Sequence, residues 1–169
     1  QKFRKIGILS SGGDAPGMNA AIRAVTRRAL SQGIEVVGIL GGYAGLLGAA
    51  DESDPEVIRE KHLRPLDAHS VSNIVTRGGT ILYSSRCPEF KTEAGMAKAL
   101  RVCHEQSIDA IIAIGGDGTF RGATDLTNHG IPSIGIPGTI DNDITASDNT
   151  IGFDTAMQTV IDNVDRLRD

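Results

Sequence analysis

Residues 137–143, PGTIDND, hold the side chains whose types and spacing best suit catalysis. Asp141 and Asp143 are separated by one residue, and the hydroxyl of Thr139 precedes both. Paired acids beside a hydroxyl suit proton transfer and the organisation of a metal ion. An enzyme that phosphorylates an alcohol needs a base at the attacking oxygen and a cation near the transferring phosphoryl group. Asp141 fits the first need and Asp143 could help to place magnesium; a structural turn is the plain alternative.

Residues 115–119, GGDGT, form a second candidate segment, between an apolar run and a helical pattern. The backbone N–H groups of such a loop, with the positive end of the following helix, can bind phosphate oxygens. Asp117 adds a carboxylate where a magnesium ion would bridge the phosphates. We therefore expect nucleotide binding here, although GGDGT also occurs in NAD kinases and lipid kinases. The structural alternative is a tight turn in which Asp117 caps the helix.

Two further segments are less specific when each is taken alone. Residues 10–19, SSGGDAPGMN, form a glycine-rich turn in which Pro16 is pre-organised for a helix start. An ordinary strand-to-helix turn explains that pattern equally well. Residues 77–90, RGGTILYSSRCPEF, contain Arg86, whose guanidinium could stabilise charge on a transferring phosphoryl group. A solvated surface arginine is the alternative for Arg86.

Alternating apolar runs and helical patterns must position these segments. The runs are short and rich in Ile and Val, as in buried parallel strands, and they cover residues 5–9, 34–40, 108–114 and 131–136. The helical patterns cover residues 17–32, 95–106 and 119–129. This alternation predicts an α/β fold, with an open, mostly parallel sheet and helices on both faces in a Rossmann-like three-layer arrangement. Ligands bind beyond the carboxyl ends of such strands, so we expect the glycine-rich loops to form one site.

The remaining segments define the expected domain organisation. Residues 48–67 are charged and carry two prolines, and we interpret them as an insertion with a short helix. Residues 153–168 place apolar side chains at helical spacing and predict an amphipathic helix. We expect a nucleotide-binding domain over residues 1–152 and, in residues 153–169, a helix leading to a second domain of a longer protein. An authentic C-terminal helix is the alternative.

The composition of the chain excludes several classes of protein. The 169 residues are 40% hydrophobic, which favours a globular domain over disorder, and the apolar runs are too short to cross a bilayer. The net charge of −4 and the absence of tryptophan argue against a nucleic-acid or membrane partner. Cys87 and Cys103 make neither a disulfide framework nor a zinc-ligand set. We therefore expect a reducing cytoplasm.

Taken together, these segments resemble the phosphofructokinase family. The match runs in order through KIGILSSGGDAPGMNAAIR, RGGTILYSSRCPEF, IIAIGGDGTF, IPGTIDNDI and TIGFDTA. It covers nearly the whole chain outside residues 48–67, and long motifs in order are far more specific than one glycine loop. The resemblance implies the phosphofructokinase fold and ATP-dependent phosphorylation of fructose 6-phosphate to fructose 1,6-bisphosphate in glycolysis.

The resemblance also implies roles for the matching residues. Asp141 would be the general base on the 1-hydroxyl of the sugar, with Asp143 assisting, and Thr139 and Ile140 would lie against the sugar. Asp117 would hold Mg²⁺, and Arg86 would bridge the two substrates. The residues expected to line ATP are Gly13, Tyr43, Arg86, Cys87, Gly116, Asp117, Gly118 and Thr119.

Two glycines bear on the phosphoryl donor. Family members that use pyrophosphate commonly carry Asp where this chain has Gly118, and Lys where it has Gly138. An acidic side chain at position 118 would crowd and repel the α-phosphate of ATP, and a lysine at position 138 would occupy phosphate space. Both positions are glycine, so ATP is favoured and pyrophosphate is the alternative donor.

The chain also departs from the family pattern. Arg23 and Arg27 match two arginines with which bacterial relatives bind a regulatory nucleotide at subunit contacts, and they are the allosteric candidates; the polar face of a helix is the alternative. A third arginine would fall near Ala68, which cannot pair with phosphate, so we do not expect ordinary activation by ADP or inhibition by phosphoenolpyruvate. The resemblance implies a homotetramer.

The resemblance implies that most of the residues that grip the sugar phosphate belong to the expected second domain. Two rival functions remain open. One is another small-molecule kinase with GGDGT, such as an NAD kinase. The other is a nucleotide-binding module that has no activity of its own.

Overall fold

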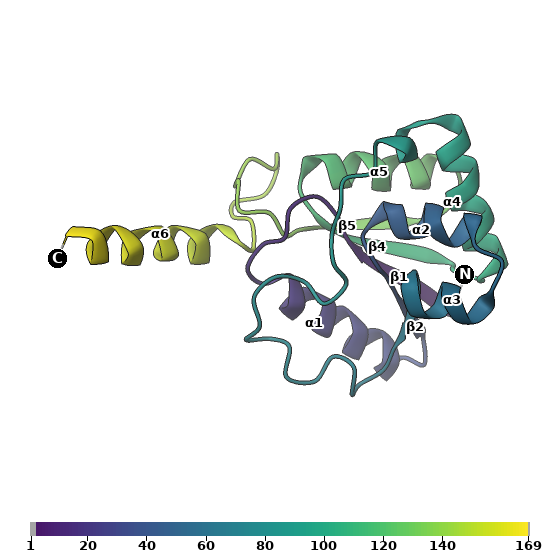
Figure 1. The fold of residues 1–169 in the computed structure, drawn as a ribbon, viewed down its shortest axis with the longest axis horizontal. Coiled ribbons are helices and arrows are strands. Elements are labelled where there is room, and N and C mark those ends of the chain that lie inside the picture. The colour runs from purple at the N-terminus through teal and green to yellow at the C-terminus, as the bar shows by residue number, and fades with distance from the viewer. Residues whose placement is uncertain (1–2, 169) are drawn as a thin grey trace.

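The fold centres on one five-stranded sheet, which the computed structural model describes within residues 3–168. The strand order is β3-β2-β1-β4-β5, and β1, β2, β4 and β5 are labelled in Figure 1. The strands are β1 Lys5–Ser10, β2 Glu35–Ile39, β3 Leu63–Leu66, β4 Ala110–Gly115 and β5 Ser133–Pro137. All neighbouring pairs are parallel except β2 and β3. The predicted open, mostly parallel α/β sheet is confirmed.

β1 is the centre from which the strand order runs in both directions. Gly7 of β1 lies opposite Val37 of β2 on one side and Ile111 of β4 on the other. The chain order therefore reverses beside β1, and the loops that follow β1 and β4 leave the sheet next to each other. Ligands of open α/β sheets bind at such a switch point. This topology places the segments 10–19 and 115–119 together.

Helices cover both faces of the sheet because alternate strand residues point to opposite sides. Ile6 and Ile8 of β1 pack in one cluster with α1, Met18–Ser31, whereas Leu9 packs in the other. That second face is covered by the helices α2 Tyr43–Asp51, α4 Glu93–Glu105 and α5 Asp117–Asn128. The three predicted helices at 17–32, 95–106 and 119–129 correspond to α1, α4 and α5 and are confirmed within a few residues.

Residues 48–67 contain more regular structure than the sequence predicted. The expected short helix is α3, Pro55–Lys61, capped by the Asp54 carboxylate, which accepts from the Glu56 N–H at 2.9 Å. The segment begins inside α2, however, and it ends in β3, an antiparallel strand at the edge of the sheet. β3 was missed because LRPL is short and contains a proline, which edge strands tolerate.

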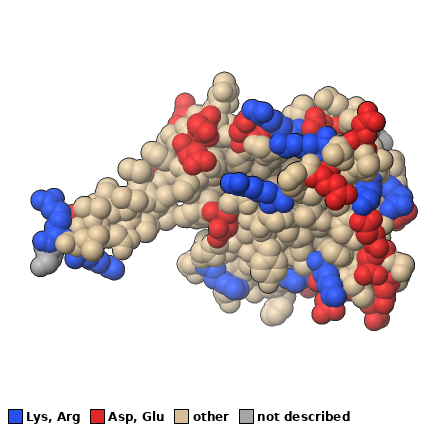
Figure 2. Space-filling view, turned by 45° about the horizontal axis from the view of Figure 1, so that its top comes forward, with Lys and Arg blue, Asp and Glu red and all other residues tan. Residues whose placement is uncertain are grey.

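The last helix, α6 Phe153–Arg168, projects away from the sheet (Figure 1). Its predicted amphipathic pattern is confirmed, but none of its residues is buried. The exposed apolar side chains are Met157, Val160, Ile161, Val164 and Leu167. The face of this arm turned toward the viewer in Figure 2 is largely free of charged side chains along its length, with basic side chains at its far end.

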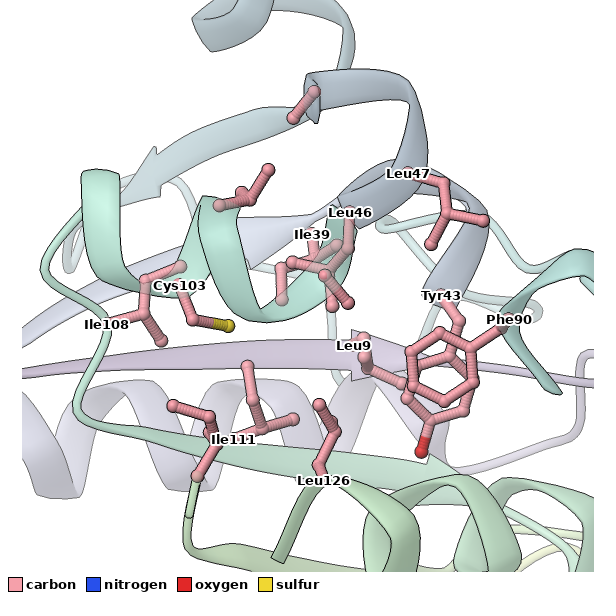
Figure 3. Close-up of a cluster of buried hydrophobic side chains, with 14 of the residues drawn as sticks. Leu9, Ile39, Tyr43, Leu46, Leu47, Phe90, Cys103, Ile108, Ile111 and Leu126 are labelled. Atoms are coloured by element: carbon pink, nitrogen blue, oxygen red, sulfur yellow. The ribbon is translucent and has the colours of Figure 1, made fainter. Parts of the chain in front are cut away.

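Tyr43 joins α2 to α5 through the larger apolar cluster. Its ring stacks on Phe90 with centroids 4.1 Å apart, and its hydroxyl donates to the Thr119 carbonyl oxygen at 2.7 Å (Figure 3). The side chain is buried, and this burial, with a smaller effect of the Asp125 charge, raises the pKa of the hydroxyl above its usual range. The contact fixes the first turn of α5 against the core.

Replacing Tyr43 by phenylalanine should therefore destabilise the fold. Tyr43→Phe keeps the stacked ring but leaves the Thr119 carbonyl without this donor, so we expect a loss of about 1–2 kcal/mol in the free energy of unfolding. The folded protein retains the Tyr43 proton after the unfolded chain releases it. Stability should thus fall as the pH rises above about 10, and the variant should lack this contribution.

Urea denaturation followed by circular dichroism measures both effects. Tyr83→Phe is the matched control, because Tyr83 is 64% exposed, and its stability should change by less than about 0.5 kcal/mol. Equal stability changes in the two variants would contradict the structural role of the Tyr43 hydroxyl.

Candidate functional site

The loops after β1 and β4 meet at the switch point of the sheet. The Ser11 N–H donates to the Ile114 carbonyl at 3.0 Å, and the Thr119 hydroxyl donates to the Ser11 carbonyl at 3.1 Å. A Cβ atom at Gly115 would lie only 2.5 Å from the same Ser11 oxygen. Glycine at position 115 is therefore required for this close approach, and any side chain would push the loops apart.

The loop after β5 joins this pair. The Gly138 N–H donates to the Gly115 carbonyl at 3.0 Å, and a Cβ at Gly116 would lie 3.5 Å from Thr139 Cβ, an ordinary van der Waals distance. A fourth segment closes behind it, because the Gly152 N–H donates to the Thr139 carbonyl at 3.2 Å. The structure thus brings together the glycine-rich loops that the sequence predicted would share one edge of the sheet.

Asp141 lies exposed at this edge in a short hydrogen-bonded turn. The Thr139 hydroxyl accepts the Asp141 N–H at 3.1 Å and donates to Asp141 Oδ2 at 3.2 Å. The carboxylate is therefore held by its neighbour while its other oxygen has no partner within the described residues. The adjacent Asn142 has a positive φ of 51° and accepts from the Thr150 N–H at 2.8 Å, which pins the turn from the far side. Ile140 and Asp143 are also exposed.

Asp117 begins α5, and its exposed carboxylate pairs with Arg121 at 2.8 Å, one helical turn later. No cluster of three or more His, Cys, Asp or Glu side chains suited to a metal ion occurs within residues 3–168. Magnesium at phosphate sites commonly takes only one or two carboxylates, with phosphate oxygens and water completing its shell. The exposed Asp117 fits that demand once Arg121 releases it.

The first turn of α5 also suits anion binding. The first N–H groups of a helix lack intrahelical acceptors and carry partial positive charge. Gly116 caps this end, and Gly118 is exposed, with no atom from outside its own stretch of helix within 4 Å of the position its Cβ would occupy. Gly13, in the neighbouring loop, is likewise exposed and open. Both glycines leave the backbone accessible to a ligand.

Two of the residues expected to line the nucleotide are buried. Tyr43 is 4% exposed and Thr119 is 3% exposed. The hydroxyl of each donates a hydrogen bond to a backbone carbonyl. The Tyr43 hydroxyl holds Thr119 and the Thr119 hydroxyl holds Ser11, so both side chains have partners in the core, and their place beside a nucleotide stays a prediction. The family resemblance assigned them to the nucleotide, and only the packing distinguishes a supporting residue from an exposed one.

Arg86 lies exposed at the end of a segment without regular secondary structure. The preceding residue is anchored, since the Ser85 hydroxyl donates to the Gly41 carbonyl at 2.8 Å. Cys87, partly buried, begins the short 3-10 helix Pro88–Lys91 and packs against the core beside Phe90. Within the described part of the chain, the Arg86 guanidinium has no hydrogen-bond or ion-pair partner and can meet a ligand. The backbone next to it is held by the Ser85 bond to Gly41.

Two buried polar residues at this site were missed by sequence reasoning. Ser10 is fully buried and Asn19 is 1% exposed, and both hydrogen-bond to residues 77–83. The available signal was their polarity at positions where β1 and α1 face the core. The allosteric candidates lie elsewhere, on α1, where Arg23 is partly exposed and Arg27 exposed, and Ala68 is exposed after β3.

One property bears on location. Within residues 3–168, no helix combines the length and the hydropathy that crossing a membrane would require.

Comparisons with known proteins agree with this geometry. The sequence pattern of the family described as Phosphofructokinase matches residues 5–169. The chain is 52% identical over 167 residues to an ATP-dependent 6-phosphofructokinase of Halalkalibacterium halodurans, covering 99% of this chain and 49% of that protein. It is 54% identical over 168 residues to the enzyme of the same name from Halothermothrix orenii, with coverages of 99% and 47%.

A solved structure resembles the fold as well. The phosphofructokinase of Saccharomyces cerevisiae superposes with a TM-score of 0.86 at 32% identity, over 98% of this chain and 24% of that one. The chain spans about half the length of the curated relatives it matches. Because the family match extends over nearly every residue from β1 to the end of α6, this chain belongs to the phosphofructokinase family.

Proposed function

We propose that the protein containing this chain transfers the γ-phosphoryl group of ATP to the 1-hydroxyl of fructose 6-phosphate. The observation that carries the proposal is the exposed Asp141 carboxylate, oriented by Thr139 at the edge where two phosphate-type loops meet. The relatives at 52–54% identity are named ATP-dependent 6-phosphofructokinases, which supports the same reaction here. The product would be fructose 1,6-bisphosphate, in glycolysis.

The reaction needs one proton acceptor and several groups that stabilise negative charge. Asp141 takes the proton from the sugar hydroxyl as its oxygen attacks the γ-phosphorus and the bond to the ADP oxygen breaks. Thr139 keeps the carboxylate aimed by donating to Oδ2, and Asp143 assists from the same turn. The N–H groups at the start of α5 hold the phosphates, and Arg86 stabilises charge on the group in transfer.

Asp117 would hold Mg²⁺, and the bound ion would neutralise phosphate charge. The exposure of the Asp117 carboxylate supports this assignment, and its pairing with Arg121 gives it a partner when no ion is bound. The cation and Arg121 would compete for the Asp117 carboxylate, so Arg121 would lose this partner when the ion is held there.

Asp141→Asn should identify the general base. The amide preserves shape but cannot accept the proton, so turnover should fall by about 10²–10⁴-fold while ATP affinity changes little. Steady-state kinetics and calorimetry, on a protein of the relatives' length, measure these two quantities. Glu60→Gln, an exposed acid on α3, is the matched control and should leave turnover unchanged. Near-normal turnover in Asp141→Asn would remove Asp141 as the base.

The same assays separate the rival functions. A substrate panel with fructose 6-phosphate and NAD distinguishes a sugar kinase from an NAD kinase. For residues 1–169 alone, ATP binding without turnover would support a nucleotide-binding module that depends on the rest of the protein for catalysis.

Gly118→Asp should test the donor. The open space around this position lets the protein accommodate the new side chain, so folding should be preserved and the effect should fall on the ligand. A carboxylate beside the phosphates should weaken ATP binding by at least about tenfold through repulsion. Calorimetry measures the affinity. Gly130→Asn is the control, because Gly130 follows the opposite end of α5 and Asn tolerates its positive φ. Unchanged ATP affinity would refute the placement of phosphates at Gly118.

Gly138 has a different constraint from Gly118. A Cβ at this position would lie 2.7 Å from Ile114 Cγ2, so in this packing any side chain at position 138 would require Ile114 to shift. The donor argument therefore depends on Gly118, and pyrophosphate remains the alternative that a Gly118→Asp variant tests.

We also propose that α6 packs against a second, sugar-phosphate-binding domain found in the relatives' remaining length. A helix with five large apolar side chains exposed by 45–88% is stabilised when that face is covered. This division assigns residues 1–152 to nucleotide binding. The full protein would be a cytoplasmic homotetramer, and Arg23 and Arg27 remain candidates for a regulatory phosphate contact.

Val160→Asp tests the covered face. In a protein of the relatives' length, a buried unpaired carboxylate should lower the free energy of unfolding by about 2–4 kcal/mol. In residues 1–169 alone the same change should have little effect, because Val160 is 56% exposed. Asn163→Asp, on the polar side of α6, is the control in denaturant titrations. Equal effects in both lengths would contradict the proposal.

A further inference from the structure

The segment of residues 77–86 is held in place by side chains from other elements. It contains neither helix nor strand, and in Figure 1 it belongs to the long irregular connection between β3 and α4. Its own backbone supplies few internal hydrogen bonds, so its conformation must depend on outside partners. Arg86, proposed above to act on the transferring phosphoryl group, is the last residue of this segment.

Asn19, in the first turn of α1, binds the start of the segment. Its side-chain Nδ2 donates to the Arg77 carbonyl at 2.9 Å and lies 3.5 Å from the Gly78 carbonyl, while Oδ1 accepts from the Ile81 N–H at 2.8 Å. Both ends of the buried amide are used, and every partner is backbone. The Asn19 amide therefore constrains the backbone of this segment and does not contact its side-chain polar groups.

Ser10, the last residue of β1, binds the middle of the segment. Its hydroxyl lies 2.7 Å from Thr80 Oγ1 and donates to the Tyr83 carbonyl at 2.9 Å. Because the single Ser10 proton goes to Tyr83, Thr80 is the donor in the other contact. The intervening Leu82 is fully buried, and its carbonyl accepts from the Gly41 N–H at 2.8 Å.

These two residues flank the first glycine loop. The irregular part of this loop is residues 11–17; Ser10 ends β1 before it and Asn19 lies in the first turn of α1 after it, so the chain on both sides of the loop is bonded to residues 77–83. The Ser85 bond to Gly41 then fixes the backbone next to Arg86. A displacement of the first glycine loop would therefore shift the backbone of residues 77–85, and Arg86 would move with it.

We propose that Asn19 and Ser10 are positioning residues that set where Arg86 stands relative to the phosphates, through the backbone of residues 77–85. This inference rests on the proposed kinase function. Neither residue needs to touch a substrate, since both are buried.

A double-mutant cycle in a protein of the relatives' length tests the proposal. Asn19→Asp is nearly isosteric and keeps the acceptor for Ile81, but it replaces the donor to the Arg77 carbonyl with a repelling oxygen. We expect kcat to fall by about 10- to 100-fold. In an Arg86→Ala background the same change should lower kcat by less than about twofold, because its effect passes through Arg86.

Thr26→Val is the matched control on α1. Thr26 is equally buried, and its hydroxyl has no hydrogen-bond partner within the described residues, so kcat should be unchanged. Equal losses from Asn19→Asp in both backgrounds, or no loss at all, would overturn the proposal. If Asn19→Asp does not fold by circular dichroism, Ser10→Ala enters the same cycle with the same expectations.

Hydrogen exchange provides a readout that does not depend on the reaction. Asn19→Ala removes the acceptor of the Ile81 N–H, so exchange at Ile81 should accelerate by at least about tenfold, with amides in residues 77–85 following it. Unchanged protection would overturn the proposal whatever the protein catalyses. If exchange accelerates in Asn19→Ala but the unsubstituted protein does not phosphorylate fructose 6-phosphate, the positioning contacts stand, and the proposed function and the role assigned to Arg86 are contradicted instead.

Discussion

The close approach of the backbone after β1 to the backbone after β4 is the constraint on which the site depends. Ser11 donates to Ile114 and accepts from Thr119, and this spacing exists only because position 115 carries no side chain. The loop after β5 then bonds to Gly115 and brings Thr139 and Asp141 alongside. A single interloop distance thus determines where the first N–H groups of α5, proposed to bind phosphate, and the exposed carboxylate stand with respect to each other.

Buried polar side chains and exposed charged side chains have separate tasks in this arrangement. Ser10, Asn19 and Thr119 are almost completely buried, and each donates to backbone of a distant segment. In a low-dielectric interior such satisfied bonds specify one loop conformation, whereas an unsatisfied group would be costly. The carboxylates of Asp117 and Asp141 stay at the surface, so they keep their hydration when the protein folds and remain accessible to a ligand.

The uncovered face of α6 places the chain within the architecture of its family. Five of its large apolar residues, from Met157 to Leu167, are exposed, and the matched relatives are about twice as long as this chain. The nucleotide-type loops and the carboxylate come from the β1–β5 sheet. In the proposed division, the surface that receives a sugar phosphate would take residues from the relatives' other half. Covering α6 and completing the site would then be one structural event.

Periodicity and local motifs were enough to predict the parallel strands, helices α1, α4, α5 and α6, and the shared edge at which the glycine loops meet, because these depend on neighbouring residues. The antiparallel β3 escaped prediction, as did the burial of Tyr43 and Thr119. Whether a polar residue in a motif faces ligand or core is decided by contacts such as Asn19 with Arg77 and Thr119 with Ser11, which join residues 58 and 108 positions apart. Sequence alone therefore determined which residues could do chemistry and at which edge, while tertiary packing decided which of them are exposed to do it and which hold the others in place.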